Sequence, residues 1–171
     1  MTDRKVGGTM ILEMKNIRKS FGSGESRVEV LKGIDMELEK GEICVLLGPS
    51  GSGKSTLLNI IGGIDQPDSG TIVIRGEEME QMNEKKLTQY RRVHLGYIFQ
   101  QYNLIANLNI KENVEVGAYL SEHPLPIDPL LKDLGLYEHR HKLPNQLSGG
   151  QQQRTAIGRA IIKNPDILLC D

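Results

Sequence analysis

Hydrophobic and polar positions form two patterns along this chain, and each pattern predicts a different kind of strand. Between Val28 and Leu38 apolar residues fall largely at every second position, which is typical of a half-exposed antiparallel strand. Residues 10–17 and 71–74 are further strand candidates. The runs at 43–47 and 97–99 are continuously apolar, which predicts strands buried on both faces. An antiparallel sheet and a more deeply buried sheet are therefore both expected.

Apolar residues at helical spacing predict helices between and after these strands. Residues 54–61 carry such a pattern, which stops at Gly62 as helices often do. The other helix candidates cover residues 83–93, 111–120, 129–136 and 148–163. Helices that alternate with buried strands indicate an α/β fold. The stretch at about 103–146 is broken by prolines, and we expect it to be a helical insertion into that fold.

The strongest local signal is a glycine-rich loop between the apolar run at 43–47 and the helix at 54–61. Its sequence G-P-S-G-S-G-K-S-T fits G-x-x-x-x-G-K-[ST], in which glycines let backbone N–H groups turn onto one anion. The lysine adds a compact ammonium, and the next serine adds a hydroxyl suited to Mg²⁺. The helix N-terminus also favours negative charge. The predicted nucleotide-binding residues here are Gly48, Ser50, Gly51, Ser52, Gly53, Lys54, Ser55 and Thr56.

Composition indicates a globular protein without general affinity for nucleic acid. Of the 171 residues, 38% are hydrophobic and 25% are charged, and the net charge is −1. The basic residues of 83–93 are therefore interpreted as a solvated helix face. No apolar run is long enough to span a bilayer and no signal peptide is recognisable, so we expect a cytoplasmic protein. Cys44 and Cys170 lie in apolar runs and are expected to be buried, reduced thiols.

The last third of the chain carries two further candidate features. Ser148 is a natural N-cap for the helix that follows, and the next two glycines leave N–H groups open to an anion. An ordinary capped helix is the alternative interpretation. Asp171 follows an apolar strand at 167–170, and the carboxyl ends of such strands are where ligands bind in open α/β sheets. His139 and His141 are interpreted as surface residues.

Taken in order, the motifs resemble those of the ATP-binding cassette (ABC) ATPases over nearly the whole chain. They are an aromatic at Phe21, the loop at 48–56, Gln100 after a strand, L-S-G-G-Q at 147–151, and Asp171. The resemblance implies an α/β P-loop core with an N-terminal antiparallel β subdomain and a short helical subdomain at about 103–146.

The resemblance also implies a role for each motif. Phe21 would stack on the adenine of ATP, and Lys54 with the loop amides would hold the phosphates. Ser55, Gln100 and Asp171 would bind Mg²⁺, Asp171 through water. A head-to-tail homodimer would bring the signature motif of one subunit over ATP bound to the other. The signature residues expected to contact ATP are Ser148, Gly149, Gly150 and Gln151.

Within this family, the loop and signature sequences look most like ATPases of the lipoprotein-release and macrolide-export type. Such a subunit couples ATP binding and hydrolysis to transport by separate membrane permeases, on the inner face of the cell membrane. The transported substrate is not encoded in these motifs. Two alternatives stay open: a soluble ABC ATPase of translation or DNA repair, and a non-catalytic nucleotide-binding module.

The end of the sequence departs from the family pattern. The chain stops at Asp171, where the family continues with a catalytic glutamate and, further on, a histidine that senses the γ-phosphate. We therefore expect residues 1–171 to be a single, incomplete cassette that binds ATP weakly and hydrolyses it poorly. We also expect a gap in its sheet, because the strand that normally lies between 43–47 and 167–170 is missing.

Overall fold

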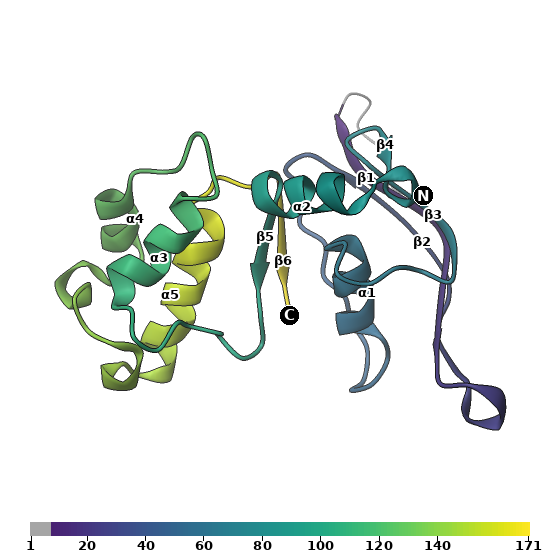
Figure 1. The fold of residues 1–171 in the computed structure, drawn as a ribbon, viewed down its shortest axis with the longest axis horizontal. Coiled ribbons are helices and arrows are strands. Elements are labelled where there is room, and N and C mark those ends of the chain that lie inside the picture. The colour runs from purple at the N-terminus through teal and green to yellow at the C-terminus, as the bar shows by residue number, and fades with distance from the viewer. Residues whose placement is uncertain (1–7) are drawn as a thin grey trace. The chain divides into compact units, whose positions relative to one another are not determined.

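The computed structural model of the protein describes residues 8–171, and their contacts divide them into two compact units (Figure 1). The N-terminal unit extends through Leu87 and the C-terminal unit begins at Thr88. The prediction of one incomplete domain over the whole chain, with a helical subdomain at 103–146, stays a prediction. None of the helices within residues 8–171 is long and apolar enough to cross a membrane.

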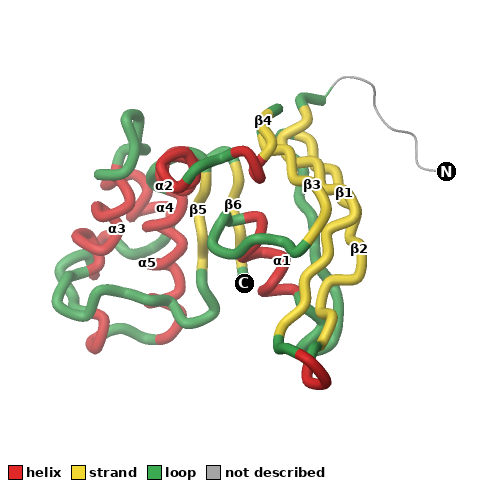
Figure 2. Tube along the Cα trace, turned by 45° about the vertical axis from the view of Figure 1, so that its right-hand side comes forward, coloured by secondary structure: helices red, strands yellow, loops and turns green. Residues whose placement is uncertain are grey.

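The N-terminal unit is built on a four-stranded antiparallel sheet with the order β2-β1-β3-β4 (Figure 2). The strands are β1 (Met10–Phe21), β2 (Val28–Glu39), β3 (Ser69–Ile74) and β4 (Glu77–Glu78). Strand β1 lies inside the sheet: its buried Met14 pairs with Met36 of β2 on one side and with Ile72 of β3 on the other. The predicted N-terminal antiparallel β subdomain is thus confirmed, and β1 runs four residues beyond its predicted end at residue 17.

One α-helix belongs wholly to this unit. Helix α1 (Lys54–Ile61) has the predicted bounds, and it buries Leu57, Leu58 and Ile60. Short 3-10 turns complete the unit, η1 (Gly24–Ser26) and η2 (Met79–Gln81). Helix α1 contributes apolar side chains to the unit and starts directly at the glycine-rich loop.

The predicted buried strand at 43–47 is wrong for this structure. The segment is an irregular connection that pairs with no strand among the described residues. Ile43 is 93% exposed and Leu47 is 89% exposed, so the apolar run has no cover. A strand buried on both faces needs neighbours to cover it, and residues 8–171 place none beside this segment. The unpaired segment is consistent with the expected gap in the sheet.

The prediction of buried thiols is also wrong, since both cysteines are free and exposed. Cys44 lies on the uncovered segment at 43–47, and Cys170 lies at the end of a strand with a single neighbour. Apolar sequence surroundings do not bury a side chain when the segment that carries it is left without packing partners.

The C-terminal unit combines a two-stranded parallel sheet with helices. Strands β5 (Leu95–Ile98) and β6 (Ile167–Cys170) pair with Leu95 opposite Ile167 and Ile98 opposite Cys170. Strand β5 begins two residues before the predicted run at 97–99 and ends at Ile98. Its first residue, Leu95, is buried, but residues 97–99 are only half-buried, so the expectation of a strand buried on both faces is wrong there. The helices are α2 (Glu84–Val93), which crosses from one unit into the other, α3 (Ile110–Ala118), α4 (Ile127–Asp133) and α5 (Gly149–Ile161), with 3-10 turns η3 (Tyr137–His139) and η4 (Pro144–Gln146).

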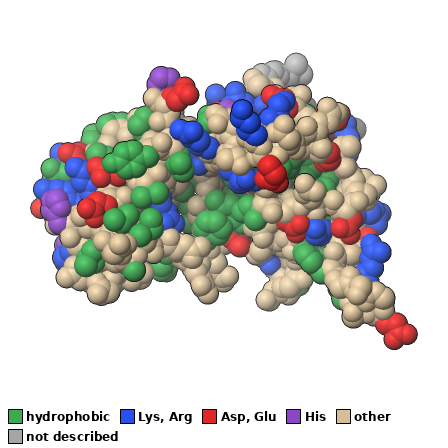
Figure 3. Space-filling model, in the orientation of Figure 1, with side chains coloured by type: hydrophobic (Ala, Val, Ile, Leu, Met, Phe, Trp, Pro, Cys, Tyr) green, Lys and Arg blue, Asp and Glu red, His purple; other side chains and the backbone are tan. Residues whose placement is uncertain are grey.

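The helical part of this unit has its own hydrophobic core. Fully buried side chains of α3, α4 and the segments beside them form it: Ile110, Val114, Leu131, Leu136 and Ile162. All of the predicted helices are present with shifts of a few residues at their ends. The surface of this unit mixes apolar side chains with charges of both signs on the face that Figure 3 shows. His141 is exposed and His139 is half-buried.

Two polar contacts satisfy the two ends of helix α2. The Asn83 side chain accepts a hydrogen bond from Lys86 N at 3.0 Å and so caps the start of α2. At the other end, the buried Lys163 ammonium donates to the carbonyl oxygens of Arg91 at 2.8 Å and Arg92 at 3.2 Å. A lysine beyond α5 therefore satisfies two of the carbonyls that α2 leaves without helical partners.

Candidate functional site

The glycine-rich loop, residues 48–56, has the backbone geometry that its sequence predicts. Gly51 has φ +78° and Gly53 has φ +93°, a left-handed region that favours glycine. Gly53 is the residue from which α1 starts, and Leu57 N donates to its carbonyl oxygen at 2.9 Å. The loop therefore feeds directly into the positive end of a helix, which favours an anion there.

The Lys54 side chain folds back over this loop. Its ammonium donates to the carbonyl oxygens of Gly48 at 2.9 Å and Pro49 at 2.8 Å, and Ser52 Oγ lies 3.4 Å away. The positive charge is thus held within the loop by groups that carry no counter-charge. Such a charge can bind an anion without first breaking an ion pair.

Phe21 lies at the same end of the β1–β2 pair as the loop. It is the last residue of β1, is 46% exposed, and pairs in register with Val28 of β2. Val30, two residues further along β2, packs against Gly53. The structure therefore places Phe21 and the loop at the same end of this strand pair, and their contacts to adenine and phosphate stay a prediction.

Gln100 and Asp171 lie at neighbouring carboxyl ends of the parallel sheet. Asp171 N donates to the carbonyl oxygen of Ile98 at 3.0 Å, which extends the β5–β6 ladder to the last residue. Gln100 follows two residues after Ile98 and is exposed. Burial and, to a smaller extent, the Asp171 carboxylate raise the pKa of Tyr97 to about 12. The negative charge of Asp171 therefore acts near the end of β5, where the family resemblance predicts a cation site.

The signature residues open α5 in the predicted way. Ser148 is the N-cap: its Oγ accepts from Gln151 N at 3.3 Å, while Gln151 Oε1 accepts from Ser148 N at 3.0 Å. This reciprocal pair fixes the first turn of the helix. The hydroxyl oxygen acts as acceptor in that bond, which leaves its O–H available to donate. Gly149 and Gly150 are exposed on the same turn.

The predicted residues therefore form a phosphate-loop group in the N-terminal unit and a second group in the C-terminal unit. The first holds Phe21 and residues 48–56, and the second holds Gln100, Asp171 and residues 148–151. The chemistry of the whole set suits a nucleotide with Mg²⁺: amide and ammonium donors for phosphates, and oxygen ligands from Ser55, Gln100 and Asp171 for the cation. The role of each residue toward ATP stays a prediction.

One residue near the signature motif was not predicted from the sequence to have a role. Arg159 of α5 donates through Nη1 to the carbonyl oxygen of Asn103 at 2.6 Å and through Nη2 to that of Tyr102 at 2.9 Å. The available signal was an arginine between Gly158 and Ala160, inside the apolar stripe of the helix. A cation in that position has to find polar partners inside the protein.

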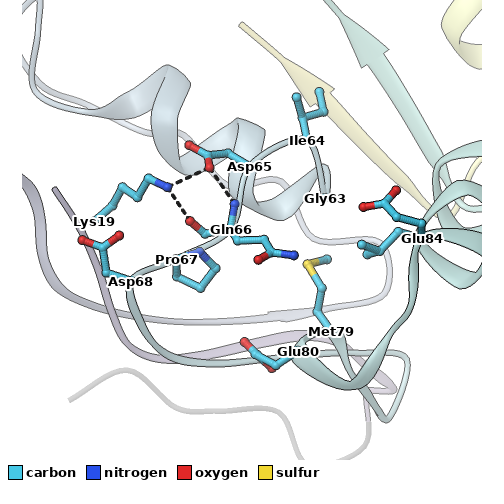
Figure 4. Close-up of a pocket in the computed structure, with 11 residues that line it drawn as sticks. Lys19, Gly63, Ile64, Asp65, Gln66, Pro67, Asp68, Met79, Glu80 and Glu84 are labelled. Atoms are coloured by element: carbon cyan, nitrogen blue, oxygen red, sulfur yellow. Dashed lines mark hydrogen bonds and ion pairs between the residues drawn. The ribbon is translucent and has the colours of Figure 1, made fainter. Parts of the chain in front are cut away.

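A cavity of about 600 Å³ also lies in the N-terminal unit, away from the phosphate loop (Figure 4). Lys19 Nζ donates to Asp65 Oδ1 at 2.7 Å and to the carbonyl oxygen of Gln66 at 2.6 Å on one wall. Met79 and Leu87 contribute apolar surface. Residues 48–56 are absent from its lining, so this cavity is not the predicted nucleotide site.

Comparison with known proteins identifies the family of this chain. A sequence profile of the family described as "ABC transporter" matches residues 31–171. A putative ABC transporter ATP-binding protein of Mycoplasma pneumoniae is 52% identical over 164 residues, covering 94% of this chain and 35% of that protein. The bacitracin export ATP-binding protein BceA of Halalkalibacterium halodurans is 45% identical over 166 residues, covering 94% and 66%.

Solved structures give the same result for the fold. A dimeric ATP-binding cassette in a post-hydrolysis state, bound to ADP and Pi, matches with a TM-score of 0.84 and 39% identity. The match covers 94% of this chain and 73% of that one. The chain thus spans about a third of the length of the Mycoplasma relative and about two thirds of BceA. The α/β ABC-cassette fold predicted from the motifs is confirmed for the part that the chain covers.

Proposed function

Since this chain belongs to the ABC transporter family of ATP-binding proteins, we propose that it is the nucleotide-binding part of a transport ATPase. The observation that carries the proposal is the phosphate loop, where Lys54 Nζ lies over the Gly48 and Pro49 carbonyls at the start of α1. Phosphates of ATP would replace those carbonyls as the partners of the ammonium, because a charged acceptor makes the stronger hydrogen bond. Phe21 would stack on the adenine.

The second residue group, together with Ser55 of the phosphate loop, would act on the cation and on the outer phosphate. Ser55 and Gln100 offer oxygen ligands to Mg²⁺, and Asp171 offers a carboxylate that can reach it through water. When bound, Mg²⁺ neutralises charge on the β- and γ-phosphates during phosphoryl transfer. Lys54 adds to that neutralisation from the protein side. Residues 1–171 supply these binding and charge-neutralising groups, and we propose that the chain on its own binds ATP weakly and hydrolyses it poorly.

We further propose that ATP is enclosed by two copies arranged head to tail. The Ser148 hydroxyl and the Gly149 and Gly150 amides of one copy would donate to the phosphates held by the loop of the other. Two features support this: Ser148 retains its O–H as a donor, and the solved cassettes that match the chain are dimeric. Permease subunits at the inner face of the cell membrane are the partners through which closure would drive transport, without a nucleic-acid ligand. The alternative ABC ATPases of translation or repair have no separate observation in their favour.

The decisive experiment measures ATP binding to the 171-residue chain by isothermal titration calorimetry, with and without Lys54→Ala. The affinity should fall by about 10- to 100-fold, as expected when a charged hydrogen bond is lost. Lys85→Ala is the matched control, because Lys85 is an exposed lysine near the start of α2. Equal ATP affinity in all three proteins would overturn the proposal. Rapid ATP turnover that Lys54→Ala abolishes would contradict the expectation of poor hydrolysis.

A further inference from the structure

Arg159 joins the helix that carries the signature residues to the loop that carries Gln100. Its two terminal nitrogens donate to consecutive carbonyl oxygens, Asn103 at 2.6 Å and Tyr102 at 2.9 Å. The described residues include no carboxylate paired with this guanidinium, and burial lowers its pKa. The guanidinium is half-buried, and moving it away would remove two charge-assisted hydrogen bonds. The contact is therefore a specific connection and differs from a loose surface bond.

Gln100 lies midway between two fixed points of the main chain. On one side, the carbonyl oxygen of Ile98 accepts from Asp171 N in the parallel sheet. On the other side, the carbonyl oxygen of Tyr102 accepts from Arg159. Each fixed point is two residues from Gln100. The sheet fixes the main chain on only one side of Gln100. The hydrogen bond from Arg159 to the Tyr102 carbonyl oxygen fixes it on the other side.

The rest of the loop and the helix behind Arg159 are also fixed. The fully buried Asn113 amide accepts from Ile105 N at 2.8 Å and donates to the Leu108 carbonyl oxygen at 2.7 Å. Helix α3 lies against α5 so closely that a Cβ atom at Gly117 would stand 2.1 Å from the Arg159 carbonyl oxygen. Arg159 therefore extends from a packed part of the unit and contacts a loop that is ordered beyond the contact.

We propose that Arg159 is a positioning residue that sets Gln100 relative to Ser148 in the same chain. Ser148 and Arg159 belong to one helix, about 16 Å apart at a rise of 1.5 Å per residue. A displacement of α5 is therefore carried by the guanidinium to the backbone two residues beyond Gln100. The inference rests on the proposed function, in which Gln100 is a Mg²⁺ ligand and Ser148 a contact to ATP.

Backbone NMR order parameters test the positioning itself, without nucleotide. Arg159→Gln should lower the order parameters of residues 100–103 from about 0.85 to below about 0.6, because the two hydrogen bonds that hold the Tyr102 and Asn103 carbonyl groups are lost. Arg92→Gln is the matched control: it removes a bond from Arg92 Nε to the Leu120 carbonyl oxygen, in the same unit but away from the loop. Unchanged order parameters at 100–103 in Arg159→Gln would overturn the inference.

Nucleotide binding tests the consequence for the site, with ATP in EDTA and ATP with excess Mg²⁺ as the two probes. Arg159→Gln should leave the affinity for ATP in EDTA unchanged and remove most of the gain that Mg²⁺ gives. Arg159→Lys should restore part of that gain, because it keeps the charge and one donor. Combining Arg159→Gln with Gln100→Ala should cost no more than Gln100→Ala alone, since both changes remove the same interaction.

The outcomes separate the two proposals. If the unaltered chain binds no ATP, the proposed function fails, and the backbone order parameters still decide whether Arg159 positions the loop. If the unaltered chain gains affinity with Mg²⁺ and Arg159→Gln keeps the full gain, the positioning role fails alone. If Arg159→Gln does not fold, both measurements are made on Arg159→Lys, with about half the loss expected because one donor nitrogen replaces two.

Discussion

Gly53 and Val30 lie so close together that a Cβ atom at Gly53 would stand 2.8 Å from Val30 Cγ1. The same glycine has φ +93° and begins α1. Two independent constraints, one from the backbone and one from packing on β2, therefore require glycine at the last position of the loop before the lysine. The geometry that would hold a phosphate is thus built against the N-terminal sheet.

The first prediction compares two glycines of the same loop. Gly53→Ala should lower the free energy of unfolding by about 2–4 kcal/mol, because it combines left-handed strain with a clash. Gly51→Ala is the control: Gly51 has φ +78° but faces open space, so the loss should be about 1 kcal/mol from strain alone. Urea denaturation measures both. Equal losses would show that Val30 yields to the new methyl group.

A second prediction concerns the uncovered segment at 43–47. Leu47→Ala should change the free energy of unfolding by less than about 0.5 kcal/mol, because Leu47 is 89% exposed. Leu57→Ala removes the same atoms from a buried position on α1, and should cost about 2–5 kcal/mol. Thermal or urea unfolding of the two variants measures both free-energy changes. A large loss from Leu47→Ala would mean that the segment packs in solution.

The exposed apolar side chains of the segment at 43–47 should also promote self-association of the protein. An extended apolar segment without a partner is a site for pairing between chains. Replacing both Val45 and Leu47 by serine should therefore reduce the concentration-dependent growth in mass that light scattering detects. The double variant should keep the ATP affinity of the unaltered chain, as it leaves residues 48–56 untouched.

A third prediction addresses the buried amide of Asn113. Asn113→Ala should cost about 3 kcal/mol, because it leaves Ile105 N and several carbonyl oxygens without their partners in a buried place. Asn145→Ala is the control at an exposed position and should be nearly neutral. Circular dichroism during urea unfolding is sufficient. A neutral Asn113→Ala would show that water replaces the amide.

A fourth prediction follows from the pKa of Tyr97, which burial and then the Asp171 charge raise to about 12. In the unfolded chain a tyrosine loses its proton near pH 10, so between about pH 10 and 12 the folded state binds more protons. Stability should therefore fall as the pH rises through that window. Tyr97→Phe should reduce the slope. An unchanged slope in Tyr97→Phe would contradict the assignment.

Local sequence signals predicted those parts of the molecule that are locally determined. Helix α1 follows from apolar spacing between Lys54 and Gly62, and the Ser148 cap follows from a serine before two glycines. The register of β5 and β6 depends on residues 72 positions apart, yet the carboxylate after an apolar run still marked the correct end of the sheet. These features could be predicted because each depends on residues that are neighbours in the sequence.

The failures concern features decided by distant partners. The run at 43–47 has the composition of a buried strand, but burial depends on neighbours that its own residues do not encode. The contact of Arg159 was not predicted for a related reason. Its partners are two backbone carbonyl groups. Every residue has such a group, so the sequence does not mark which ones an arginine will contact. Composition predicts what a segment can do, and tertiary structure decides whether it does so.

The contact between Lys163 and the end of α2 bears on the order in which the protein forms during synthesis. The sheet of the N-terminal unit is complete in sequence by Glu78, so it can pair while the ribosome is still adding later residues. Helix α2 and strand β5 lack their partners until later residues are synthesised. Lys163, which binds the last turn of α2, follows Arg92 by 71 residues, and Ile167, which pairs with Leu95, is added after Lys163. Until then, a short apolar strand stays unpaired on the nascent chain. Chaperone binding at the ribosome would therefore concentrate on the interval between the emergence of residues 95–98 and that of residues 163–170.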